Sequence, residues 1–294
     1  MRRYLRLARV QNLPTAVADP AAGALLLATR EGSLDAGRLL ALAGVSALLY
    51  SAGMVLNDVA DVERDRALHP TRPLVVGEVP LARAAIVGSA MLFLALFLAM
   101  AVGFGAVFVA TLLALFVVLY DFVLKKARLP GCLGMGILRG LNVLLGMSAL
   151  FDSATPLREV VQHELLYAPL LMAAYVTLLT LLSTFEEGKG ARVGVPAVLV
   201  AVSGVPIAAL LLVPQPAAAA IPAAAISLFF LWKASLTVRA FEASRTGLLV
   251  RDGVRAIPAI DGTMVLGHGS WFGGLAVMAL VAPAILLGRW FKGA

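Results

Sequence analysis

Long apolar segments dominate the chain, and they restrict its fold more than any other feature. A helix that crosses the hydrocarbon core of a bilayer needs about 20 mainly apolar residues. Segments of this kind lie near residues 13–29, 38–57, 82–101, 104–122, 132–152, 165–184, 195–213, 217–238 and 271–290. Because 61% of the residues are hydrophobic and only 14% are charged, the composition excludes an ordinary water-soluble domain. The sequence predicts an all-α, polytopic membrane helical bundle of about nine transmembrane helices.

The sequence contains no linker or low-complexity tract, so we expect residues 1–294 to form a single membrane domain. The basic start of the chain is similar to that of a signal peptide, but Pro14, Asp19 and Pro20 interrupt the apolar segment that follows. We therefore expect an uncleaved first transmembrane helix. Residues 233–270 carry regularly spaced cations, which predicts a cytoplasmic loop whose interfacial or re-entrant segment caps a cavity.

The distribution of basic residues predicts the orientation in the membrane. With the N-terminus in the cytoplasm, nineteen of the 24 Lys and Arg residues fall on the cytoplasmic side, in agreement with the positive-inside rule. The other five are Arg30, Arg38, Arg158, Arg289 and Lys292. We expect an integral multi-pass protein, in the cytoplasmic membrane if bacterial, with its N-terminus and active-site loops cytoplasmic. The net charge of +7 then reflects topology and affinity for anionic lipids of the bilayer or anionic substrates, and we expect no nucleic-acid partner.

The string NDVADVERD at residues 57–65 places three carboxylates at the end of the second apolar segment. Asp58, Asp61 and Asp65 are three and four residues apart, which predicts one helix face carrying all three, with Asn57 on its edge. Such a cluster repels itself unless a cation binds it. Hard oxygen ligands suit Mg²⁺, which binds through one or two carboxylates and bridges to substrate phosphates. We therefore expect a metal site that holds a diphosphate.

Four further cytoplasmic elements supply residues suited to the same site. Charged side chains inside membrane spans or at their rims are costly, so they are expected to face a polar cavity and a partner. The candidates are Arg72 in the following loop, Tyr120, Asp121 and Lys125 after the fourth segment, Arg139 and Asn142 in the fifth, and Glu186, Glu187 and Lys189 after the sixth. Cations and carboxylates around one cavity are what a diphosphate–Mg²⁺ complex needs.

These motifs resemble those of a known family. The string NDVADVERD followed by RPLVVG resembles the signature of the UbiA superfamily of intramembrane prenyltransferases. The stretches YDFVLKK from Tyr120 and RGLNVLLG from Arg139 are most similar to its EboC-like branch. The resemblance implies an all-helical bundle enclosing a central cavity, a polyprenyl diphosphate donor, Mg²⁺, and prenyl transfer to an acceptor that the sequence does not identify. One motif departs from the family pattern, because STFEEGK from Ser183 stands where a second aspartate-rich motif is usual.

The chemistry of diphosphate departure gives the candidate residues roles. Negative charge develops on the leaving oxygens, and Mg²⁺ together with fixed cations stabilises it. The expected metal ligands are Asn57, Asp58, Asp61, Asp65 and Glu186. The expected catalytic residues are Asp61, Asp65 and Lys125. The expected substrate-binding residues are Arg72, Tyr120, Arg139 and Asn142.

Other interpretations stay open on the sequence alone. Arg139 and Asn142 would equally form an interhelical hydrogen-bonded pair, and Arg72 and Lys125 would equally be membrane anchors. The chain as a whole would alternatively be a secondary transporter whose buried carboxylates relay ions, although the acidic cluster lies at a membrane edge rather than at the midplane. A third interpretation is a catalytically inactive prenyltransferase-like protein, because the second acidic motif is reduced.

Overall fold

The computed structural model describes residues 2–32, 35–151, 155–185, 191–239 and 246–290, and the regular structure within these ranges is entirely helical. Eight helices are long and apolar enough to cross a membrane, the last of them built from two consecutive pieces. They are α3 (Ala36–Ala60), α5 (Leu81–Met100), α6 (Phe104–Phe122), α7 (Arg128–Gly146), α9 (Tyr167–Ser183), α10 (Ala191–Leu210), α11 (Pro216–Arg239), and α13 (Trp271–Ala279) with α14 (Val281–Trp290). The predicted all-α membrane bundle is confirmed.

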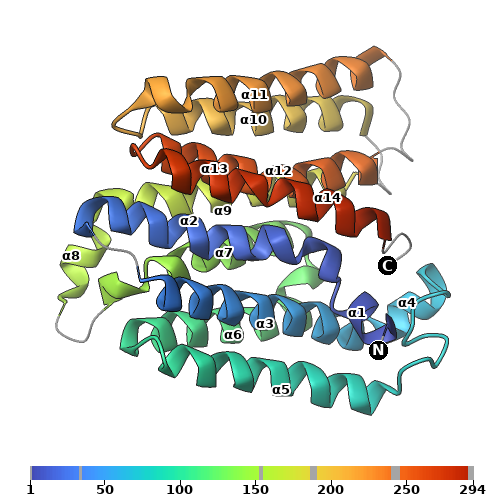
Figure 1. Ribbon diagram of the computed structural model, residues 1–294. Coiled ribbons are helices and arrows are strands. Elements are labelled where there is room, and N and C mark those ends of the chain that lie inside the picture. The colour runs from blue at the N-terminus through green and yellow to red at the C-terminus, as the bar shows by residue number, and fades with distance from the viewer. Residues whose placement is uncertain (1, 33–34, 152–154, 186–190, 240–245, 291–294) are drawn as a thin grey trace.

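Two more long helices complete the bundle (Figure 1). The helix α2 (Leu13–Glu31) covers the first predicted segment and packs against α3, α7 and α12. The helix α12 (Thr246–Leu266) lies in the region expected to be a loop, so that expectation is wrong. Ile257, Ile260 and Met264 are buried, which makes α12 a core helix rather than an interfacial cap. Charged residues in its first half hide it from a search for apolar segments.

This additional helix changes the expected topology. Because α12 precedes α13 and α14, the C-terminal end of the chain returns to the end of the bundle that carries the N-terminus (Figure 1). There α14 contacts the short helix η1 (Val10–Asn12), and the guanidinium of Arg255 packs on Gly288. Arg289 therefore lies at the same end as the N-terminus, which corrects its expected position on the opposite side. Lys292 lies outside the described residues.

Short helices shape the two ends of the bundle. The end that carries both termini contains α1 (Arg2–Leu7), η1, α4 (Val62–Leu68) and η2 (Leu124–Lys126). The opposite end contains η3 (Ser148–Phe151), α8 (Leu157–Val161) and η4 (Glu164–Leu166). The acidic string and the fourth predicted segment's polar end thus meet at the end that carries the termini. Which compartment this end faces stays a prediction.

Close packing of α2 on α7 organises the middle of the bundle. A Cβ added to Gly146 would lie 2.1 Å from the carbonyl oxygen of Pro20, closer than real Cβ atoms approach, so this position requires glycine. Small residues that let two backbones come this close are typical of helix contacts in membranes. The contact brings Asp19 of α2 beside Arg139 and Asn142 of α7.

Candidate active site

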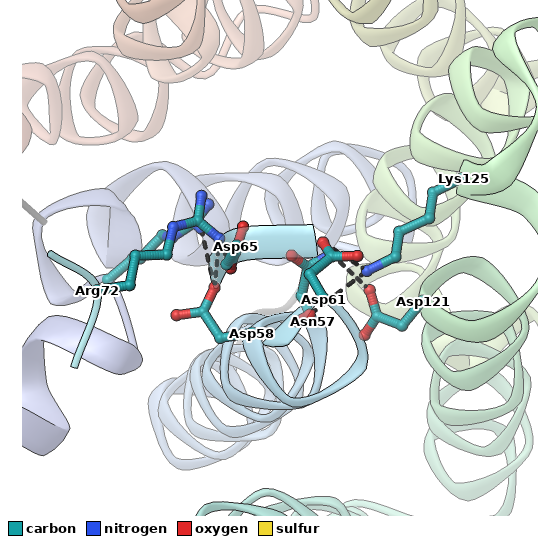
Figure 2. Close-up of polar contacts among 8 residues, drawn as sticks. Asn57, Asp58, Asp61, Asp65, Arg72, Asp121 and Lys125 are labelled. Carbon is teal, nitrogen blue, oxygen red and sulfur yellow. Dashed lines mark hydrogen bonds and ion pairs between the residues drawn. The ribbon is translucent and has the colours of Figure 1, made fainter. Parts of the chain in front are cut away.

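The acidic string lies where α3 ends and α4 begins. Asp61 separates the two helices and has φ −95° and ψ 2°, so the helix does not continue through the string. As a result Asp58 and Asp65 face Arg72, whereas Asp61 faces Lys125 (Figure 2). The expectation that all three carboxylates share one continuous helix face is therefore wrong. The carboxylates instead form two clusters at the same end of the bundle.

The first cluster is centred on Arg72. Its Nη1 lies 3.3 Å from Asp58 Oδ1 and also donates a hydrogen bond to Asp65 Oδ2. A second guanidinium reaches the same carboxylate, because Arg9 Nη2 lies 3.2 Å from Asp58 Oδ1. The Asp58 and Asp65 side chains are only 7% and 5% exposed, so these cations balance negative charge that water screens weakly.

The second cluster is centred on Lys125. Its Nζ lies 2.8 Å from Asp61 Oδ2 and 3.4 Å from the backbone oxygen of Asn57. The Asn57 side chain donates to Asp121 Oδ1 at 2.9 Å, which joins the end of α3 to the end of α6 (Figure 2). Lys125 is 11% exposed, so it belongs to the site rather than to the surface. A purely anchoring lysine would extend into the lipid headgroup region instead.

Arg9 is a site residue that the sequence did not single out, since there it counted only as a basic residue before the first span. It precedes η1 and has a φ of 45°, the single positive φ of a non-glycine residue among those described. Such a conformation costs energy and persists where the surrounding structure fixes it. The ion pair with Asp58 spans 49 residues of sequence, so no local pattern could have revealed it.

A mainly apolar cavity lies between α3, α6 and α7. Its polar lining includes Tyr120, Asp121, Arg139 and Asn142, and much of the remainder is aliphatic, such as Leu49. Asp121 lines this cavity and also accepts the hydrogen bond from the acidic string. The cavity therefore begins beside the Lys125 cluster and extends into the bundle.

Arg139 and Asn142 line this cavity, but their polar atoms are bonded to α2. Arg139 Nη1 lies 2.9 Å from Asp19 Oδ2, and Arg139 Nη2 donates to the hydroxyl and backbone oxygens of Thr15 at 3.0 and 3.2 Å. Asn142 Nδ2 donates to Asp19 Oδ2 and to the backbone oxygen of Ala16, both at 2.8 Å. These contacts match the alternative of an interhelical hydrogen-bonded pair. Substrate binding by either residue stays a prediction.

The donor atoms of the site can be compared with what Mg²⁺ requires. Among the residues that the structure describes, no three acidic, histidine or cysteine side chains converge in a metal-binding group. Mg²⁺ does not need such a cage, because it commonly binds one or two carboxylates together with waters and substrate phosphates. Asp58 with Asp65, and Asp61 beside Asn57, offer such partial oxygen sets. The residues thus fit a metal shared with a phosphate ligand, while the expected ligand Glu186 lies outside the described residues.

Comparison with known proteins identifies the family. The model of the UbiA prenyltransferase family matches residues 17–246, which is most of the chain. The chain belongs to the UbiA prenyltransferase family. This confirms, at the level of the family, the resemblance carried by the acidic string, and it confirms the assignment to integral, multi-pass membrane proteins. Placement in the EboC-like branch of the UbiA superfamily stays a prediction.

Several curated relatives are digeranylgeranylglyceryl phosphate synthases. The one from Ignicoccus hospitalis is 31% identical over 162 residues, which cover 55% of this chain and 52% of the relative. The one from Saccharolobus solfataricus is 27% identical over 181 residues, which cover 61% of this chain and 60% of the relative. This UbiA-family chain thus spans little more than half the length of the curated relatives that it matches.

Solved structures share the fold over almost the whole chain. A digeranylgeranylglyceryl phosphate synthase structure covers 94% of this chain and 98% of its own, with a TM-score of 0.62 and 24% identity. A UbiA homologue from Archaeoglobus fulgidus bound to GPP and Mg²⁺ covers 94% of this chain and 99% of its own, with a TM-score of 0.59 and 15% identity. At these identities the likeness establishes the UbiA fold alone.

Proposed function

We propose that this chain is a Mg²⁺-dependent intramembrane prenyltransferase that moves a prenyl group from a prenyl diphosphate to an acceptor. The observation that carries this proposal is that Asp121 lines the apolar cavity and also accepts a hydrogen bond from the acidic string, so the ion-paired end of the bundle adjoins the cavity. Arg9, Arg72 and Lys125 provide fixed positive charge, and the cavity that begins at Asp121 provides an apolar environment. A diphosphate fits the fixed positive charge, and an isoprenoid chain fits the apolar cavity.

During the reaction, negative charge develops on the diphosphate, close to the cations of the site. The bond between the allylic carbon and the diphosphate oxygen breaks, and its electron pair leaves on the diphosphate. The acceptor then bonds to that carbon and loses a proton. Arg72, Arg9 and Lys125 bind the departing diphosphate, so they act where negative charge grows. Mg²⁺, when bound, neutralises further charge on the leaving oxygens.

The carboxylates hold the metal and keep the cations in place before the diphosphate arrives. Asp58 and Asp65 orient Arg72, and Asp61 orients Lys125. The metal would be held by Asp58, Asp61 and Asp65 with Asn57, and by Glu186 of the second acidic motif. In the cavity the aromatic ring of Tyr120 stabilises the allylic cation, and the aliphatic walls delay its capture by water.

The acceptor belongs to the glyceryl phosphate class in this proposal. Support comes from the curated relatives, which are digeranylgeranylglyceryl phosphate synthases. An acceptor of that class has an apolar chain and a phosphate, so it suits a membrane enzyme with a basic end. Its free hydroxyl forms the new bond to the prenyl carbon and releases the proton.

The test uses the purified chain in lipid nanodiscs with Mg²⁺, geranylgeranyl diphosphate and geranylgeranylglyceryl phosphate. We expect diphosphate release in equal amount to a prenylated product identified by mass spectrometry, and loss of both with EDTA. Diphosphate release without that product would retain the enzyme and reject the acceptor class. Ion-coupled flux in proteoliposomes without diphosphate release would support the transporter, and loss of both activities would support an inactive relative.

A further inference from the structure

A second pair of carboxyl groups lies deep in the bundle, away from the acidic string. Asp19 of α2 and Asp261 of α12 both have 0% exposed surface. Their carboxyl groups lie within hydrogen-bonding reach of each other where the two helices pack together. Neither residue is part of the diphosphate chemistry described above. Two carboxyl groups held together out of water need a physical explanation, because their burial is costly.

The contacts of the two carboxyl groups differ. Asp19 Oδ2 accepts a hydrogen bond from Asn142 and forms an ion pair with Arg139 Nη1 at 2.9 Å, whereas Asp19 Oδ1 has no hydrogen-bond donor among the described residues. Both oxygens of Asp261 also have no donor within the described ranges. Three carboxyl oxygens thus lie without a donor in the place where the side chains meet. A single proton between the two groups would satisfy two of these oxygens at once.

The charge balance also indicates that one of the two carboxyl groups is protonated. Arg139 is the cation that pairs with Asp19, and its positive charge balances one carboxylate. A second ionised carboxylate would leave an uncompensated negative charge in the apolar interior, which is strongly unfavourable. The neutral group is Asp261, because the ion pair with Arg139 and the hydrogen bond from Asn142 favour the ionised form of Asp19, whereas no cation pairs with Asp261 among the described residues.

We propose that Asp261 is protonated, donates to Asp19 Oδ1, and so acts with Asp19 as a positioning pair that fixes Arg139 and Asn142 at the wall of the prenyl cavity. This inference rests on the proposed prenyl transfer, because that reaction supplies the substrate that would bind in the cavity. The pair links α12 to α2, and α2 in turn bonds α7 through Arg139 and Asn142. The helix α12, which the sequence did not predict, thereby helps to orient the side chains that line the cavity, although it does not line the cavity itself.

The arrangement also explains how an arginine can line an apolar cavity. Asp19 neutralises Arg139, and Thr15 accepts from its second terminal nitrogen, so the guanidinium presents no unbalanced charge to an isoprenoid chain. The Asn142 amide uses its nitrogen for two bonds to α2, which leaves its oxygen to accept from a ligand hydroxyl. Loss of the pair would release both side chains from their orientation.

The test compares Asp261→Asn with Asp19→Asn. An asparagine at 261 still donates to Asp19, so we expect kcat/KM for the prenyl diphosphate to stay within about threefold of wild type. Asp19→Asn leaves Arg139 unbalanced and unfixed, so we expect KM to rise about tenfold or more. If Asp261→Asn is as damaging as Asp19→Asn while both variants fold, the assignment of the proton to Asp261 is wrong.

Infrared difference spectroscopy supplies a readout that does not depend on turnover. Wild-type protein should show the carbonyl band of a buried, protonated carboxylic acid, and Asp261→Asn should lose it. Asp252→Asn, on the same helix but paired with Lys233 at 3.0 Å, is the matched control and should keep the band. A wild-type protein without the band contradicts the inference even if a variant fails to fold. If the band is present but no prenyl transfer occurs, the protonation of Asp261 stands and the proposed function is rejected.

Discussion

The two groups of carboxylates in this chain meet their cations in different surroundings. At the α3–α4 junction, Asp58, Asp61 and Asp65 pair with Arg9, Arg72 and Lys125 at one end of the bundle. Asp58 and Asp65 are buried there, but the side chains of Arg9 and Arg72 are 29% and 28% exposed. In the middle of the bundle, Asp19 pairs with Arg139 and lies beside Asp261, and both carboxyl groups are fully buried. The first group has one cation for each carboxylate, whereas the second has one cation for two carboxyl groups.

This difference separates a site that can change partners from one that cannot. An ion pair near solvent can exchange for a phosphate or a metal at modest cost, because water compensates the groups during the exchange. A buried pair loses several kcal/mol when one partner is removed, so its contacts persist. The junction is thus suited to binding and releasing a charged ligand, whereas the buried pair is suited to holding the wall of the cavity still.

Asp61→Asn at the junction is expected to have the largest effect on activity. The substitution keeps the size of the side chain but removes a proposed metal ligand and the partner of Lys125, so we expect prenyl transfer to fall by about 100-fold or more. The melting temperature should change little, because Asp61 is partly exposed. Glu63→Gln is the matched control, since Glu63 lies on α4 but is 77% exposed and, among the described residues, pairs only with Arg66. Full transfer activity in Asp61→Asn would remove this residue from the site.

Arg72→Gln tests whether the junction cations and the metal compete for the same carboxylates. We expect kcat/KM to fall by about 10–100-fold, because one of the groups that stabilises the leaving diphosphate is lost. The carboxylates of Asp58 and Asp65 then lose a competing cation, so the Mg²⁺ concentration needed for half-maximal activity should decrease. Titration of activity with Mg²⁺ measures both effects, and Arg66→Gln, at an exposed arginine of α4, is the control. An increased Mg²⁺ requirement would show that Arg72 supports the metal rather than competing with it.

Gly146→Ala tests the buried pair without touching its charges. The new methyl group would collide with the backbone of α2 near Pro20, so α2 and Asp19 must shift, and we expect a loss of about 1–3 kcal/mol in stability. Gly204→Ala in α10 is the control, because a Cβ there meets nothing within 4 Å and should stabilise by about 0.5–1 kcal/mol. Thermal unfolding in detergent measures both. Equal melting temperatures for the two variants would mean that the α2–α7 contact does not limit stability.

The sequence predicted most of the fold because apolar length is a local property. Each of the nine predicted segments is helical in the described residues, and the bundle adds one long helix to them, α12. The helix α12 was not predicted, because its first half contains Arg251, Asp252 and Arg255 and its second half contains Asp261. Polar residues that fold inward are indistinguishable from loop residues until their partners on other helices are known.

The site was predictable in composition but not in arrangement. Asp58, Asp61, Asp65, Arg72 and Lys125 do lie at one end of the bundle, as their spacing and flanking apolar segments indicated. The break at Asp61 was not predictable, because neither glycine nor proline marks it. The pairing of Arg9 with Asp58 and of Asp19 with Asp261 depends on contacts between distant segments, which a single sequence does not encode locally.

The smallest expected effect comes from a third kind of ion pair, at the surface beside the junction. Arg6 Nη2 lies 2.7 Å from Glu78 Oε2, and the two side chains are 37% and 42% exposed. Water and salt screen such a pair, so Glu78→Gln should change the stability by less than about 1 kcal/mol, and the change should shrink further at high salt. Thermal unfolding at low and high ionic strength measures this. A larger, salt-independent loss would show that this contact holds α1 against the Arg72 loop, and that the junction is as rigid as the buried pair.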